Sequence, residues 1–277
     1  MSSLAVIALF AAALPNGVVL RPVANMYSSP SLDADVVSQA IYGSNVMLME
    51  AKEGWAHIRT GDDYTGWILS GDMRQGEPYA TTGRVAQVVS KFAHVYREDS
   101  VTKHAPLITV PFETKLEVAA VPVDGARWVQ VRLPNHTMAW IQTGDITYDW
   151  KKLTGPEMLA LAKQFLGAPY TWGGTSSYGY DCSGFSQMLQ RRRGVLMPRD
   201  AQPQADWSGV TPVDRKDLKP GDLLYFGSSD KKITHTGIYL GDNKFISATT
   251  HETPMVRIDD ITDPYWARIL VAQRRVK

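Results

Sequence analysis

The chain is poor in the residues that mark several classes of protein. It has a single cysteine among 277 residues, so no internal disulfide can form. Lys and Arg total 29 against 28 Asp and Glu, and the resulting net charge of +1 gives no indication of a nucleic-acid partner or an electrostatically bound membrane. The six histidines are scattered, and the sequence contains neither an HExxH motif nor a Cys–His cluster. We therefore expect no metal and no cofactor.

Long apolar runs are also scarce. The one candidate, Leu4–Leu14, has the length of the apolar core of a signal peptide but is too short to span a bilayer as a helix. No basic residues precede it, so residues 1–16 are either an export signal or an amphipathic or buried N-terminal helix. We expect no stable insertion into a membrane.

The only cysteine, Cys182, lies in the most distinctive stretch of the chain. A loop rich in glycine and aromatic residues precedes it, and Phe185, Met188 and Leu189 then repeat at helical spacing. A thiol at the start of that helix lies at the positive end of the helix dipole, which favours the nucleophilic thiolate. A lone cysteine is more often a small buried apolar residue, but the surrounding glycines and aromatic residues favour a reactive one.

A nucleophilic thiol needs a base, and His235 is the best candidate. It lies in a β-rich run that ends at Gly241–Asn243, and the partner strand follows. If Gly-Asp-Asn forms a three-residue loop, His235 lies opposite Thr249, with Ser247 and His251 as diagonal neighbours on the same face. A two-residue loop would move both to the other face. The sequence thus permits a Cys–His pair with a third polar residue that orients the imidazole.

Residues 17–147 contain an internal repeat. Trp55 and Trp67 in the first half, and Trp128 and Trp140 in the second, are each twelve positions apart, and a Gly-Asp dipeptide follows both pairs. This similarity indicates a duplicated module, and the alternating strands and short turns indicate small barrels. We expect most of the four tryptophans to pack in the barrel cores.

Residues 154–277 resemble the NlpC/p60 family of cell-wall cysteine peptidases, and the two repeated units resemble bacterial SH3-like domains. The segments that carry the first resemblance are Gly167–Gly174, Asp181–Phe185, Met197–Asp200, Leu218–Phe226 and His235–Gly241. Together they imply a multidomain protein with two small all-β SH3-like barrels, at 17–75 and 83–147, followed by an α+β papain-like cysteine peptidase domain at 154–277.

The resemblance implies an enzyme that hydrolyses peptidoglycan stem peptides. The implied bond joins γ-D-glutamate to a diamino acid, in muropeptides that have a free N-terminal L-alanine. The alternatives are a cell-wall-binding protein without activity, and an amidase or acyltransferase built on the same thiol fold. We expect a monomer in the cell envelope or outside the cell, with the cytoplasm as the alternative.

The resemblance also implies roles for individual residues. Cys182 is the nucleophile and His235 the base, Tyr170 lies near the oxyanion, and Asp181 and Ser183 help to hold the free amine of the substrate. Many relatives have a histidine where Ser247 stands, so we expect His251 to orient His235, with Ser247 as the alternative. Tyr64 is the candidate aromatic residue by which the first SH3-like unit closes the cleft.

Local patterns predict further elements of the C-terminal part. Thr154 and Glu157 form the pattern of a capping box and predict a helix start. Residues 197–214 are irregular and polar, which predicts a loop at the edge of the cleft, and Asp263–Trp266 predicts a turn.

Overall fold

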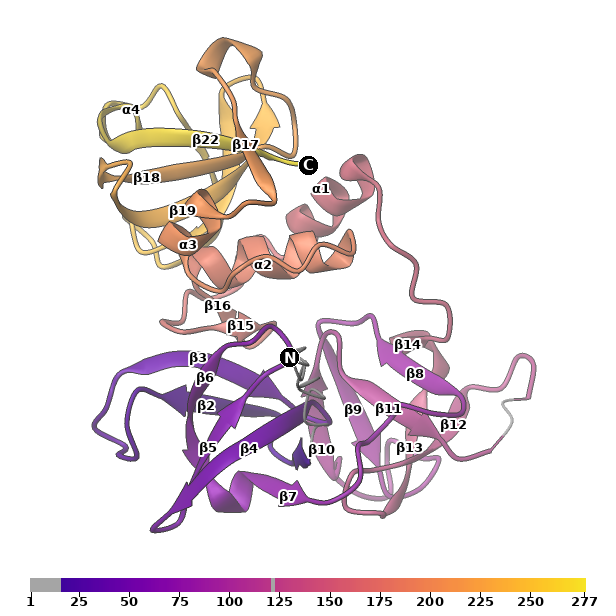
Figure 1. The fold of residues 1–277 in the computed structure, drawn as a ribbon. Coiled ribbons are helices and arrows are strands. Elements are labelled where there is room, and N and C mark those ends of the chain that lie inside the picture. Colours follow the sequence, from indigo (N-terminus) through magenta and orange to yellow (C-terminus); the bar gives the residue numbers. More distant parts are fainter. Residues whose placement is uncertain (1–15, 121–122) are drawn as a thin grey trace, which may run out of the picture.

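The computed structural model describes residues 16–120 and 123–277, and the predicted N-terminal segment lies outside this part apart from Asn16. Two β-units occupy the lower half of Figure 1, side by side, and the C-terminal domain lies above them. We refer to residues 17–75 as the first unit and to residues 85–147 as the second unit. In the described part of the chain, no helix is long and apolar enough to cross a membrane.

The first unit is a seven-stranded sheet with the order β3-β2-β6-β5-β4-β1-β7. Its strands are β1 (Gly17–Val19), β2 (Val23–Tyr27), β3 (Val36–Ile41), β4 (Asn45–Lys52), β5 (Trp55–Arg59), β6 (Thr65–Leu69) and β7 (Met73–Gln75). Alternate residues of β5 and β6 are buried, as expected of strands with one face on a core.

The second unit repeats this topology with the order β10-β9-β13-β12-β11-β8-β14. Its strands are β8 (Val85–Val88), β9 (Phe92–Tyr96), β10 (Ile108–Pro111), β11 (Lys115–Val118), β12 (Trp128–Arg132), β13 (Met138–Gln142) and β14 (Ile146–Thr147). A short 3₁₀ turn precedes the last strand of each unit. The duplication predicted from the tryptophan spacing is therefore visible in the strand order.

The repeated tryptophans do not fill the two cores, contrary to the expectation from the sequence. All four are half-buried, because they stand on strand faces that are only partly covered. Trp55 packs edge-to-face against Tyr27 at 5.5 Å between ring centroids, and Trp128 packs in the same way against Tyr96 at 5.4 Å. The cores consist of smaller residues, such as Ile58 and Ile68 in the first unit and Val131 and Ile141 in the second.

The C-terminal domain combines four helices of the described chain with a six-stranded sheet of order β17-β22-β18-β19-β20-β21. The helices are α1 (Gly155–Gln164), α2 (Cys182–Arg192), α3 (Ala201–Asp206) and α4 (Pro264–Ile269). The strands are β17 (Val210–Pro212), β18 (Leu223–Ser229), β19 (Lys232–Gly241), β20 (Lys244–Thr249), β21 (Met255–Asp260) and β22 (Leu270–Val276), with a separate hairpin of β15 (Thr175–Ser176) and β16 (Gly179–Tyr180). The main core lies where α1 and α2 pack on this sheet.

Local sequence signals in this domain are confirmed at several points. Thr154 accepts a hydrogen bond from the Glu157 backbone N–H at 3.4 Å, and Glu157 accepts one from the Thr154 N–H at 2.7 Å, which completes the predicted capping box. Gly194 has a φ of +84° just after α2, the left-handed conformation that favours glycine at a helix end.

Two short helices were not predicted. Residues 197–214 contain α3 and β17, and α4 begins inside the predicted turn at Asp263–Trp266. Each of the two helices has six residues, too few for an apolar period to be recognised in the sequence. Packing of their buried residues, Ala205 in α3 and Trp266 in α4, stabilises them.

The β15–β16 hairpin packs against both units, and it immediately precedes α2 in the chain. Thr175 donates from its backbone N–H to the Gln39 side chain at 3.1 Å in the first unit. The Ser177 hydroxyl accepts from the Phe112 N–H at 3.1 Å in the second unit. Phe112 itself extends into the core of the C-terminal domain. The two units are therefore packed against the domain rather than loosely attached to it.

We expect Thr154→Ala to lower the free energy of unfolding by ~1 kcal/mol, because the first turn of α1 loses its side-chain cap. The measurement is urea denaturation followed by circular dichroism. Thr102→Ala, in an exposed loop, is the control and should leave stability unchanged. Equal effects of the two substitutions would show that the capping box does not stabilise α1.

Candidate active site

Cys182 is the first residue of α2, and Asp181 is its N-cap. The Asp181 carboxylate accepts a hydrogen bond from the Gly184 N–H at 2.7 Å, which caps the first turn of the helix. The thiol is 7% exposed. Backbone hydrogen bonds from Thr236 and Ser183 reach the sulfur, so Cys182 lies beside the strand residue that follows His235.

The helix start does not make Cys182 a resting thiolate, contrary to the expectation from the sequence. Burial raises the pKa of the Cys182 thiol to about 12, and the negative charge of Asp181 acts in the same direction. The backbone hydrogen bonds and the positive charge of Arg199 lower the pKa by less than burial raises it. Desolvation therefore outweighs the favourable end of the helix.

His235 lies on β19 and is oriented by Ser247 on β20. The imidazole Nε2 is 3.1 Å from the Ser247 hydroxyl oxygen. Burial and, to a lesser extent, the charge of His251 lower the pKa of His235 to about 3. Both shifts favour a neutral thiol and a neutral imidazole.

The strand register explains why Ser247 is the partner. The predicted register is confirmed by the pairs Ile238–Ile246 and Tyr239–Phe245. The loop is different, because Gly241 pairs with Lys244 across a two-residue turn. An irregularity between Tyr239 and Gly241 compensates for the shorter loop and keeps Ser247 on the face of His235.

His251 does not orient His235 as we expected. It lies beyond the end of β20, and its ring stacks on Tyr265 with 3.9 Å between centroids and an interplanar angle of 2°. The sequence placed it one diagonal from His235 on the assumption that the strand continues. β20 ends at Thr249, so the regular strand stops before His251.

Asp181 is engaged in a buried ion pair, which the sequence analysis missed. Arg199, 2% exposed, reaches both carboxylate oxygens of Asp181, at 2.5 and 3.0 Å. It also donates to the Ser183 hydroxyl at 2.8 Å and to Ser38 of the first unit at 3.2 Å. Asp181 and Ser183 therefore both accept from Arg199, so the Asp181 carboxylate already has a charged partner. Arg199 belongs to the Met197–Asp200 motif, but nothing in the sequence indicated that Asp181 is its partner.

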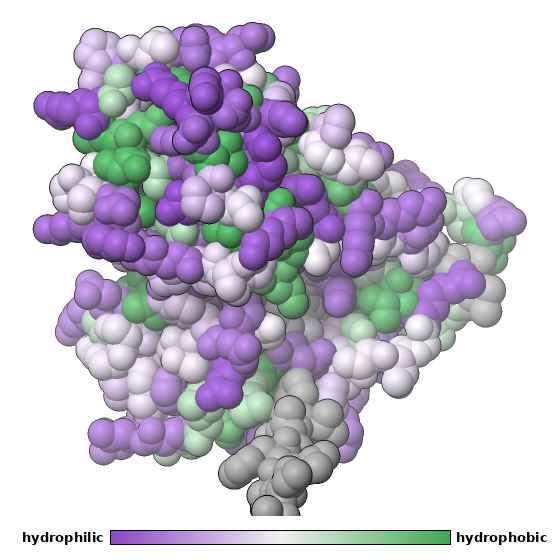
Figure 2. Space-filling model, turned by 45° about the horizontal axis from the view of Figure 1, so that its top comes forward, coloured by the Kyte–Doolittle hydropathy of each residue, from purple (hydrophilic) through white to green (hydrophobic). Residues whose placement is uncertain are grey.

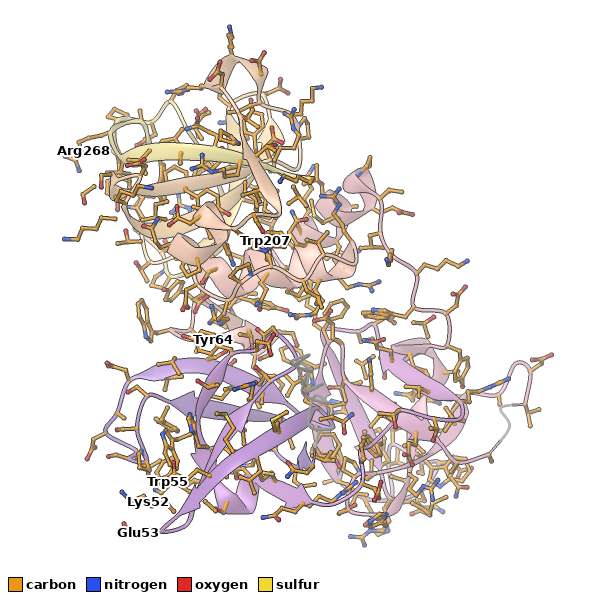
Figure 3. All side chains as sticks on the ribbon, in the orientation of Figure 1. Lys52, Glu53, Trp55, Tyr64, Trp207 and Arg268 are labelled. Atoms are coloured by element: carbon orange, nitrogen blue, oxygen red, sulfur yellow. The ribbon has the colours of Figure 1, made fainter. Side chains whose placement is uncertain are left out.

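Tyr64 lies where the first unit faces the C-terminal domain (Figure 3). The Tyr64 hydroxyl donates to the Asp200 carboxylate at 3.0 Å. Burial raises the pKa of Tyr64 to about 12, and the charge of Asp200 adds to this shift. Burial also raises the pKa of Asp200, although Arg199 and the Tyr64 hydroxyl oppose it. The two residues line a cavity of about 320 Å³ together with Trp207.

Tyr170 lies near the thiol. Burial raises its pKa, and the charges of Cys182 and Asp181 raise it further. The Tyr170 N–H donates to the Pro254 carbonyl at 3.1 Å, which connects this residue to the segment between β20 and β21. Trp172, two residues on, is 69% exposed.

A larger cavity of about 510 Å³ lies where the three parts of the chain meet. Two of its carboxylates have hydrogen-bond partners, since Asp62 accepts from Gln187 and Glu113 from Arg191. Figure 2 shows hydrophilic residues covering much of the surface seen in that view. Within residues 16–120 and 123–277, no group of three or more His, Cys, Asp or Glu residues has the arrangement of a metal site.

In this chain a cysteine at the start of a helix and a histidine on a strand belong to one domain, which follows two β-units in the sequence. Comparison with known families matches residues 167–275 to the NlpC/P60 family and residues 26–73 to the bacterial dipeptidyl-peptidase Sh3 domain. The chain therefore contains an NlpC/P60 domain, preceded by a bacterial SH3 domain.

Known proteins are similar to this chain over most of its length. A gamma-D-glutamyl-L-lysine dipeptidyl-peptidase of Bacillus cereus is 29% identical over 254 residues, which cover 86% of this chain and 74% of the relative. A protein of the same name from Bacillus subtilis is 28% identical over 263 residues, covering 88% and 82%. The crystal structure of an NlpC/P60 family protein from Bacillus cereus superimposes with a TM-score of 0.81 at 22% identity, covering 94% of this chain and 99% of that one. The last likeness shows that the fold is shared.

We expect Arg199→Met to lower the free energy of unfolding by ~3–5 kcal/mol, because it leaves the buried Asp181 carboxylate without a partner. Urea denaturation measures the loss. The double substitution Asp181→Asn with Arg199→Met removes both charges and should recover part of it. A loss below ~1 kcal/mol for the single variant would mean that the ion pair is not the anchor of this region.

We expect the rate of Cys182 alkylation by iodoacetamide to rise about tenfold per pH unit from pH 6 to 10, without a plateau, because the pKa of the thiol is raised to about 12. The chain has no other cysteine, so mass spectrometry reports this thiol alone. The unfolded protein in urea is the control, and its rate should level off above the ordinary thiol pKa. A plateau from pH 5 upward in the folded protein would instead indicate a preformed thiolate–imidazolium pair.

Proposed function

We propose that this protein is a cysteine peptidase that hydrolyses peptidoglycan stem peptides at the bond between γ-D-glutamate and a diamino acid. The observation that carries the proposal is the position of Cys182 at the start of α2, with the backbone of Thr236 against its sulfur and His235 held by Ser247. The names of the Bacillus relatives support the choice of bond.

The reaction starts from neutral groups. As the Cys182 sulfur attacks the carbonyl carbon, the thiol proton moves to His235 and the carbonyl electron pair moves onto oxygen. When the tetrahedral intermediate collapses, the C–N bond breaks and the imidazolium returns the proton to the leaving amine. Water then attacks the thioester with His235 as base, which releases the new carboxylic acid and restores the thiol.

The tautomer of His235 follows from its hydrogen bond. If Nε2–H donates to the Ser247 hydroxyl, Nδ1 has a free lone pair and accepts the thiol proton.

Two groups suit the developing oxyanion. The Cys182 N–H, first of the helix, has no intrahelical acceptor, and Tyr170 remains protonated because its pKa is raised.

The free amine of the substrate fits Asp200 better than Asp181. Asp200 is half-buried, lines a cavity and carries one neutral donor, Tyr64. An ammonium group would supply the charged partner that its carboxylate lacks there. Tyr64 of the first unit would then close the end of the cleft, which limits the substrate to trimmed stem peptides with a free L-alanine.

The proposal also includes the domain architecture of the chain. The second unit has the strand order of the first, which supports two SH3-like barrels at 17–75 and 83–147. The helix that presents the cysteine to an antiparallel sheet supports an α+β papain-like domain at 154–277. Peptidoglycan as substrate favours the cell envelope, whereas trimmed muropeptides are also compatible with the cytoplasm. A monomer remains our expectation.

We expect the protein to release lysine from L-Ala-γ-D-Glu-L-Lys and to cut the N-acetylated tripeptide ~10–100-fold more slowly, because acetylation removes the charge that pairs with Asp200. Asp200→Asn should cause a similar loss on the free tripeptide, mainly through KM. Asp206→Asn, exposed at the last residue of α3, which Asp200 immediately precedes, is the matched control. Product analysis by liquid chromatography and mass spectrometry measures each rate.

Cys182→Ala should abolish all cleavage. Activity on intact peptidoglycan but not on the free tripeptide would remove the roles given to Tyr64 and Asp200. Release of an intact stem peptide from the sugar would establish an amidase, and absence of any cleavage would favour a wall-binding protein.

A further inference from the structure

His235 is enclosed by aromatic side chains. Trp266 of α4 lies 5.2 Å from it between ring centroids, at 31° between the ring planes, and Phe226 of β18 lies at 5.5 Å and 47°. In the described part of the chain, the imidazole makes one side-chain hydrogen bond, to Ser247. The His235 imidazole is therefore packed between aromatic rings and has one polar side-chain partner in this part of the chain.

The hydrogen bond to Ser247 is a weak restraint on the orientation of the imidazole. A serine hydroxyl is neutral, and a hydrogen bond between neutral groups is about half as strong as one to a carboxylate. One such bond also fixes only one direction, so the ring can still turn about it. No carboxylate hydrogen-bonds to the imidazole among the described residues, so the remaining constraint on the ring must come from its aromatic neighbours.

Trp266 is itself firmly held. It is 2% exposed and packs against Phe226 at 5.0 Å and Phe245 at 5.1 Å. The adjacent Tyr265 stacks on His251. The short helix α4 is thus fixed on its buried side by the Phe226–Phe245 pair and on its outer side by the His251 ring.

We propose that Trp266 is a positioning residue for His235. Its indole keeps the imidazole in the one orientation in which Nε2 faces Ser247 and Nδ1 is left for the thiol proton, and the stack of Tyr265 on His251 holds the helix that carries it. This inference rests on the proposed peptidase function, whereas the orientation itself can be measured without a substrate.

The test compares Trp266→Leu with Phe165→Leu. Phe165 is 1% exposed in the main core of the same domain, and its ring packs against Phe112, Tyr180 and Phe185 rather than His235 or Trp266, so it is a control for lost aromatic packing. We expect Trp266→Leu to lower kcat by ~tenfold or more with little change in KM, because proton transfer depends on imidazole geometry. Phe165→Leu should stay within about threefold of the parent protein, and Trp266→Phe should recover most of the activity.

Nitrogen NMR of labelled histidine provides the second readout. The parent protein should show one His235 tautomer, protonated at Nε2, and Trp266→Leu should show a mixture of both tautomers. If Trp266→Leu does not fold, Tyr265→Leu takes its place and should give a smaller change of the same kind.

Unchanged tautomer and kcat in a folded Trp266→Leu, or equal losses in Phe165→Leu, would overturn the proposal. Where the parent protein cuts no stem peptide, the peptidase function fails, while the tautomer measurement still decides whether Trp266 orients the ring.

Discussion

The ion pair between Asp181 and Arg199 is the interaction on which the site depends most. It joins the N-cap of α2 to the segment before α3, and Arg199 also reaches Ser38 of the first unit. Two charges this deeply buried are costly to desolvate, so the pair is retained only where its geometry is nearly complete. Ser183 and Gly184 supply the remaining hydrogen bonds to it. The position of Cys182 is thereby fixed through the residue that precedes it.

The same burial favours the neutral forms of the two groups that we propose to be catalytic, Cys182 and His235. The negative charge needed to balance Arg199 stands beside the thiol and opposes its ionisation, and desolvation does so more strongly. Desolvation likewise keeps His235 neutral. Nucleophile activation then depends on a proton transfer within the reaction rather than on a standing charge. A neutral pair tolerates a serine as orienting residue, because no resting imidazolium has to be stabilised.

Local features of this chain could be predicted from the sequence, and features that join distant segments could not. The capping box at Thr154, the N-cap at Asp181 and the β19–β20 register each depend on residues a few positions apart. The partner of Asp181 lies eighteen residues away and Ser38 lies in another unit, so no periodicity points to them. His251 was misplaced because the end of β20 was not visible in the sequence. The short helix α4 was not predicted because its buried residue, Trp266, packs against residues of the sheet that are distant in the sequence.

The packing of the two β-units argues against a role as flexible tethers. A tether needs a linker that lets its domains move apart, whereas here one hairpin, β15–β16, bonds to Gln39 of the first unit and to Phe112 of the second. The hairpin leads directly into Asp181 and Cys182. Separating either unit from the C-terminal domain would break these hydrogen bonds and expose Phe112, whose burial is worth ~1.5–3 kcal/mol. Tyr64 therefore faces Asp200 as part of a rigid arrangement, and the first unit contributes to the shape of the cleft rather than merely to its location.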